Sequence, residues 1–178
     1  MTTLMSKMRR FIMSADGSTT IEFVIWFPLY MTLFLTSFEL TYYGFRSVFL
    51  ERAVDMQVRE LRLGQRPADL DELKEEICEK TLIVFGDCER ELTVDIRDIS
   101  TSTWNVPEGP LPCVDRADDF KEPEDVEFGP GGAGDFLLLR ACFVTDPLFS
   151  TTPWILGLPR DASGGIALVA VTTYVNEP

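Results

Sequence analysis

A run of sixteen uncharged residues near the N-terminus constrains this 178-residue chain most strongly. It reads FVIWFPLYMTLFLTSF from Phe23 to Phe38, and apolar character extends over 21–45 if Glu22 and Glu39 are tolerated. About 20 helical residues, rising 1.5 Å each, cross a hydrocarbon core about 30 Å thick. A buried core helix is the alternative, but the run has no polar stripe and the chain offers little surface to wrap it. The sequence therefore predicts one membrane-spanning helix.

Charge is distributed unevenly on the two sides of this run. Lys7, Arg9 and Arg10 precede it without a neighbouring acid, whereas nearly all of the acidic residues follow residue 50. The positive-inside rule keeps a basic flank in the cytoplasm. We therefore expect a cytoplasmic N-terminus and place the remainder of the chain on the far side of the membrane.

The composition argues against several functional classes. The chain has 29 acidic and 16 basic residues, a net charge of −13 that would repel a phosphate backbone, so we expect no nucleic-acid partner. Histidine is absent, which removes histidine-based acid–base catalysis and histidine zinc ligands. No serine-hydrolase elbow, P-loop or dinucleotide fingerprint is present, and the glycine-rich run over 129–134 indicates a turn. We expect no catalytic activity, no metal and no cofactor.

The residues before the apolar run have the order of a processing motif. Gly17 is followed by Ser18, and the acid Glu22 stands at the fifth position after the glycine, next to Phe23. This order resembles the cleavage motif of type IV pilin-like proteins, in which a membrane-embedded aspartyl prepilin peptidase cuts after the glycine and leaves the apolar helix attached. In the Flp or Tad subclass a tyrosine follows the acid, so Phe23 is an aromatic departure from that pattern.

The wider sequence is similar to TadE-like proteins, the minor pseudopilins of tight-adherence (Tad) pili. The similarity lies in DGSTTIEFV over 16–24 with Pro28 after it, in GDFLLLRACF over 134–143, and in the closing AVTTYVNEP over 170–178. It implies a minor pilin or pseudopilin that takes part in the assembly or initiation of a Tad/Flp-type pilus and is cut after Gly17.

The same resemblance implies partners and a location. The partners are other Tad/Flp pilins and pseudopilins, the prepilin peptidase and the inner-membrane assembly platform of the pilus. The chain is expected to be a single-pass inner-membrane protein with its C-terminal domain in the periplasm, or to be incorporated into the pilus.

The residues around the cleavage site suit this role. An acid such as Glu22 near one end of a membrane helix costs roughly 2.5–3.5 kcal/mol. After cleavage it could pair with the Ser18 amine of a neighbouring subunit and set the register, or it could instead reach water at the interface. Gly17 suits a narrow peptidase site because it lacks Cβ, although it could equally cap the helix. Pro28 removes a backbone hydrogen bond and is expected to kink the helix.

Beyond a cytoplasmic leader over 1–17 and a transmembrane helix over 18–45, we expect an extracytoplasmic TadE-like α+β domain over 46–178. The long helix is expected to continue, amphipathically, until Gly64 and Pro67, and a second helix capped by Asp69 is expected to end near residue 80. Strands are indicated over 82–85, 92–97, 136–144 and 166–175. A long helix packed on a small antiparallel sheet of about four strands is a pilin-like arrangement.

All four cysteines follow the predicted span, in what would be an oxidising compartment. Four thiols permit three pairings. Cys78 and Cys88 bracket a short helix-to-strand connection, while Cys113 lies in a long loop and Cys142 on a strand, which favours Cys78–Cys88 and Cys113–Cys142. No C-x-x-C pair is present, so a four-cysteine zinc site and redox catalysis are both disfavoured.

Several alternatives stay open at this point. The acids of the loop over 105–134 could gather calcium, although a solvated loop is the simpler interpretation. Trp154 and Ile155 could contact a partner or fold back on the core, and we expect the latter. As a whole, the chain could instead be an uncleaved, signal-anchored binding or envelope protein, or a membrane-anchored hydrolase that uses Asp95 and Asp98.

Overall fold

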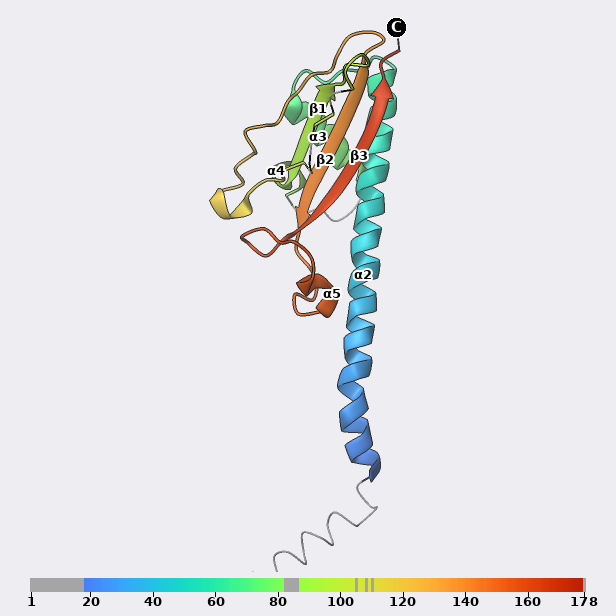
Figure 1. The fold of residues 1–178 in the computed structure, drawn as a ribbon, viewed down its shortest axis with the longest axis vertical. Coiled ribbons are helices and arrows are strands. Elements are labelled where there is room, and N and C mark those ends of the chain that lie inside the picture. Colours follow the sequence, from blue (N-terminus) through green and yellow to red (C-terminus); the bar gives the residue numbers. More distant parts are fainter. Residues whose placement is uncertain (1–17, 82–86, 105, 108, 110, 178) are drawn as a thin grey trace, which may run out of the picture. The chain divides into compact units, whose positions relative to one another are not determined.

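The computed structural model describes residues 18–81, 87–104, 106–107, 109 and 111–177 (Figure 1). The chain divides into two compact units, residues 1–38 and 39–178. The first contains the N-terminal part of a long helix, α2 (Ser18–Arg62), and the second contains the rest of α2 and all of the other elements. The leader over 1–17 lies outside the described residues.

Helix α2 remains one α-helix of 45 residues although Pro28 lies inside it. Proline lacks the N–H that would bond to the carbonyl four residues earlier. The polar side chains of the next turns are satisfied on the helix itself, because the Thr32 hydroxyl donates to the Pro28 carbonyl at 2.8 Å and the Thr36 hydroxyl donates to the Thr32 carbonyl at 2.7 Å. These threonines therefore add little polar cost to an apolar surface.

In the second unit, α2 contributes one face to the core. Leu50, Ala53, Val54, Val58 and Leu61 are buried on it, at the spacing of a helix that packs along one side. The helix ends at Arg62, and Gly64 follows with φ +84, a left-handed conformation that glycine adopts readily. The expected continuation of the long helix, and its stop near Gly64, are both confirmed.

Helix α3 (Leu70–Lys80) begins as its sequence predicts. The Asp69 side chain accepts a hydrogen bond from the backbone N–H of Glu72 at 2.9 Å, the usual N-cap interaction. Leu73 and Ile77 are buried on the face turned toward the core. A short helix, α4 (Cys88–Glu91), leads directly into the first strand.

The sheet has three antiparallel strands in the order β1-β2-β3, and Figure 1 shows β2 between its neighbours. The strands are β1 (Leu92–Asp98), β2 (Phe136–Thr145) and β3 (Ile166–Val175), with Val94 opposite Ala141 and Ala141 opposite Ala170. The fold is thus α+β as expected, but with three described strands in place of about four. The strand expected over 82–85 lies outside the described residues.

Two disulfides fasten the connections of this unit. They join Cys78 to Cys88 and Cys113 to Cys142, the pairs that the sequence favoured. The first links α3 to α4 across ten residues, and the second ties the long connection between β1 and β2 to the central strand. The second disulfide thereby fixes the β1–β2 connection to a buried strand.

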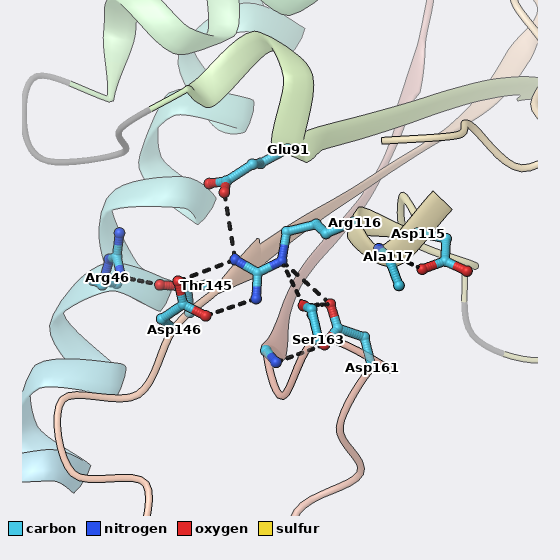
Figure 2. A network of polar contacts seen from close by, with 10 residues as sticks. Arg46, Glu91, Asp115, Arg116, Ala117, Thr145, Asp146, Asp161 and Ser163 are labelled. Atoms are coloured by element: carbon cyan, nitrogen blue, oxygen red, sulfur yellow. Dashed lines mark hydrogen bonds and ion pairs between the residues drawn. The ribbon is translucent and has the colours of Figure 1, made fainter. Parts of the chain in front are cut away.

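Arg116, in the connection between β1 and β2, lies at the centre of a network of polar contacts (Figure 2). It lies in η2 (Arg116–Asp118), and its guanidinium reaches Asp146 at 2.7 Å, Asp161 at 3.3 Å and Glu91 at 3.4 Å. Hydrogen bonding to Asp146 raises the pKa of Arg116, so it stays charged. One partly buried cation therefore joins the β1–β2 connection to α4 and to the β2–β3 connection.

Candidate functional site

The apolar surface of α2 in the first unit is the feature most suited to a function. Val24, Ile25, Trp26 and Phe27 are consecutive, and each is about half exposed or more, from 46% for Phe27 to 66% for Ile25. Four consecutive residues complete a full helical turn. No side of this turn is buried against the residues that the structure describes, so it needs an apolar environment such as lipid or neighbouring helices.

This helix is long and apolar enough to cross a membrane. Its exposed apolar residues extend from Ile21 to Phe38, with Phe23 packed on Phe27 and Trp26 near Tyr30, at centroid distances of 5.2 and 6.3 Å. Pairs four residues apart lie on one face of a helix, so these aromatic rings form ridges along it. Such ridges are suited to packing between helices.

The residues of the predicted processing motif lie at the start of this helix. Gly17 lies outside the described residues, and Ser18 is the first residue of α2. Glu22 follows four residues later, about one turn along the helix, and is exposed, as is Phe23. The Glu22 carboxylate therefore faces outward, where a neighbouring chain could reach it.

Glu39 is a functional candidate that the sequence reasoning missed. It is 1% exposed, and its two carboxylate oxygens accept hydrogen bonds from the backbone N–H groups of Leu148 at 3.0 Å and Phe149 at 2.8 Å. A buried acid requires such partners. The available signal was the acid itself, placed directly after the sixteen uncharged residues, but nothing in the sequence pointed to its partners more than 100 residues away.

Trp154 and Ile155 fold back as expected. They lie in α5 (Pro153–Leu156), within the connection from β2 to β3. Ile155 is fully buried, and the Trp154 ring packs edge-on against Tyr43 of α2 with centroids 5.2 Å apart. The Tyr43 hydroxyl donates in turn to the Ala167 carbonyl at 3.1 Å. This cluster attaches the loop and β3 to α2 at Tyr43, near the beginning of the second unit.

The two acids of the hydrolase alternative do not converge. Asp95 is fully buried, and its carboxylate accepts from Arg140 at 2.8 Å, from Arg97 at 2.9 Å and from the Glu127 N–H at 2.9 Å. Asp98 lies three residues along β1 and is exposed, so it points to the opposite face of the strand. An acid whose oxygens are already paired is poorly placed to act as a general base.

Acids of the long loop are spread over separate ion pairs. Described pairs join Glu122 to Lys74, Asp119 to Arg90, Glu124 to Lys121 and Glu127 to Arg97. Within the described part of the chain, no three acids or cysteines form a group that could hold a metal ion. The loop is therefore held by basic side chains of the same unit.

Comparison with known proteins bears on the N-terminal part of the chain. The family model for TadE-like proteins matches residues 17–59, which include Gly17, Glu22, Pro28 and most of α2. The resemblance to this family is thus confirmed for that segment. The similarity noted over 134–143 and 170–178 lies beyond the matched residues. No curated protein and no solved structure matches the chain.

Proposed function

Because its residues 17–59 match the TadE-like family, we propose that this chain is a minor pilin or pseudopilin that takes part in the assembly or initiation of a Tad/Flp-type pilus. The observation that carries the proposal is the uncharged helix surface from Phe23 to Phe38, on which every residue from Phe23 to Phe34 is exposed. Such a surface can lie in lipid before assembly and between neighbouring helices afterwards. The chain acts through packing and not through catalysis.

The proposal includes removal of the leader over 1–17 by a prepilin peptidase that cuts between Gly17 and Ser18. Ser18 is the first residue of α2 that the structure describes. The apolar helix remains attached to the domain after the cut.

Glu22 would then set the axial register between subunits. The new amine on Ser18 of one chain and the exposed Glu22 of its neighbour have opposite charges, and both lie in the first turn or two of the helix. In an apolar surrounding, a subunit shifted along the axis would leave both charges unpaired, at a cost of about 3–5 kcal/mol. The ion pair therefore selects one arrangement of the subunits.

The proposal also assigns a location to each segment of the chain. The leader is cytoplasmic, residues 18–45 span the inner membrane, and the domain over 46–178 is periplasmic, where its disulfides would be maintained. Direct partners are other Tad/Flp pilins and pseudopilins and the inner-membrane assembly platform. Pro28, inside the apolar helix, is proposed as a kink that assists transfer from the bilayer to the filament.

Processing tests this proposal directly. The chain, with a C-terminal tag, is co-expressed with a prepilin peptidase, and the mass and N-terminal residue of the purified protein are measured. We expect the wild type to begin at Ser18 and the Gly17→Leu variant to retain Met1. Gly44→Leu is the matched control, because a Cβ added at Gly44 meets no atom within 4 Å, and it should be processed like the wild type.

Two results would contradict the proposal. A wild-type chain that keeps Met1 in the presence of an active peptidase would favour the uncleaved, signal-anchored envelope protein. Equal processing of wild type and Gly17→Leu would show that cleavage does not depend on the motif.

A further inference from the structure

The connection between β2 and β3 contains an apolar loop without charged residues. Residues 147–159 read PLFSTTPWILGLP, thirteen residues without a charge in a chain in which 25% of residues are charged. Leu148 is 46% exposed and Leu156 is 64% exposed. Exposed leucines without a charged neighbour in the same loop indicate a surface that contacts something apolar.

Hydrogen bonds and aromatic packing attach this loop to α2 at the end of the predicted span. The Glu39 carboxylate, which binds the N–H groups of Leu148 and Phe149, immediately follows the last residue of the uncharged run. One turn further along α2, Tyr43 packs on Trp154. The loop is therefore held beside the residues of α2 that directly follow the uncharged run.

The length of the helix places this attachment in the interface. Counting about 20 residues for the hydrocarbon core from Phe23 leads to Tyr42. Tyr42 and Tyr43 then lie at headgroup level, where tyrosine and tryptophan are enriched in membrane proteins. Trp154, half-buried against Tyr43, lies at the same level.

We propose that the 147–159 loop lies on the lipid surface of the membrane, with Leu148 and Leu156 inserted between the headgroups. The inference rests on the proposed membrane insertion of α2 and adds a second contact with the lipid, made by the folded domain. A lipid surface is favoured over a protein partner because the loop contains no charged residue and is bound to α2 at Glu39 and Tyr43, whereas the chain as a whole carries a net charge of −13. The contact fixes the base of the domain against the bilayer.

Tryptophan fluorescence in vesicles tests this contact. The full chain is reconstituted into phosphatidylcholine vesicles with or without bromine atoms on the acyl chains, since bromine quenches only tryptophans close to it. The native reporter is Trp154, left alone by Trp26→Phe and Trp104→Phe. A second reporter adds Leu156→Trp to a background in which all three native tryptophans are phenylalanine.

The matched control is Leu63→Trp in the same background. Leu63 is also 64% exposed, but it follows the end of α2, about 35 Å along the helix from Glu39. We expect the brominated lipid to lower the emission of Trp154 and of the Leu156→Trp reporter at least twofold and to leave the Leu63→Trp reporter unchanged. Because Trp154 requires no substitution in the loop, it reports even if Leu156→Trp disturbs the fold.

A chain that retains only Trp26 separates this inference from the proposed function. If Trp26 is quenched while Trp154 and Leu156→Trp are not, the helix is inserted and the loop contact is wrong. If emission at both loop positions instead shifts with protein concentration and not with bromination, the loop docks on a second copy of the chain. If Trp26 itself is not quenched, membrane insertion and the loop contact are both wrong.

Discussion

Tyr174 carries a buried hydroxyl that has no hydrogen-bond partner among the described residues. The side chain is 4% exposed, and burial raises its pKa to about 12, against a smaller opposing effect of Arg66. A buried polar group without a partner costs about 1–3 kcal/mol. The hydroxyl therefore lowers the stability of the second unit at neutral pH, and burial opposes its ionisation at alkaline pH.

This residue predicts an alkaline loss of stability. The folded-state pKa of about 12 is above the unfolded value near 10, so folding is unaffected below about pH 10 and is destabilised as pH rises from there toward 12. We expect Tyr174→Phe to lose less stability than the wild type over this range and to be at least as stable at pH 8. Urea unfolding in detergent micelles between pH 8 and 11.5 measures both quantities.

The other tyrosines are present in both the wild type and Tyr174→Phe, so the effect of their ionisation cancels in the difference between the two free energies of unfolding. A variant that is destabilised by more than about 1 kcal/mol at pH 8 would indicate a lost hydrogen bond, and it would contradict the description of this hydroxyl.

At the scale of elements, the two disulfides constrain segments of different length. The Cys113–Cys142 bridge spans 29 residues and the Cys78–Cys88 bridge spans 10. Restricting the unfolded chain stabilises the fold by about 3.6 kcal/mol for the longer segment and about 2.7 kcal/mol for the shorter one. Cys142 is also fully buried in β2, so its removal leaves unfilled space in the sheet.

We therefore expect the double variant Cys113→Ala/Cys142→Ala to be less stable than Cys78→Ala/Cys88→Ala by about 1 kcal/mol or more. Each variant keeps the other disulfide and serves as its control. The midpoints of urea unfolding at neutral pH give the order, and the reverse order would show that the β1–β2 connection is held chiefly by its ion pairs.

Local patterns in the sequence predicted most of these elements. Strand β3 alternates between buried and exposed residues, as its sequence does, and Asp69 caps α3 because a capping residue acts within one turn. Local pattern does not determine the number of strands, because a short apolar run such as 82–85 has no periodicity of its own.

The contacts of the candidate site could be predicted only in part. Gly17, Glu22 and the apolar run are recognisable because they are close in sequence, and the family match covers them. Glu39 with Leu148, and Arg116 with Asp146 and Asp161, join residues that are 109, 30 and 45 positions apart. Local pattern carries no information about such pairs, because they depend on how the whole unit folds.

At the scale of the whole molecule, the two units meet different requirements. The second unit has a closed core, two disulfides and buried ion pairs such as Asp95 with Arg140. The described part of the first unit leaves its apolar helix surface exposed and carries one acid, the exposed Glu22. In the proposed function, assembly depends on the first unit, so substitutions there should affect the pilus without affecting the fold of the domain.

Glu22 provides the test of this separation. We expect Glu22→Gln to insert, to be processed and to form both disulfides like the wild type, because none of these requires the charge. Its incorporation into pili should fall at least tenfold, since a loss of only 1.4 kcal/mol from the subunit contact has that effect. The amounts in the membrane fraction and in sheared pili, measured from one culture, give the ratio.

Glu51→Gln is the control, because Glu51 is an exposed acid on the same helix but lies beyond the apolar run. Its incorporation should equal that of the wild type, so a loss confined to Glu22→Gln reports the position of the charge and not the net charge. Equal incorporation of all three proteins would show that Glu22 reaches water at the interface, and the register would then depend on the aromatic ridges of α2 alone.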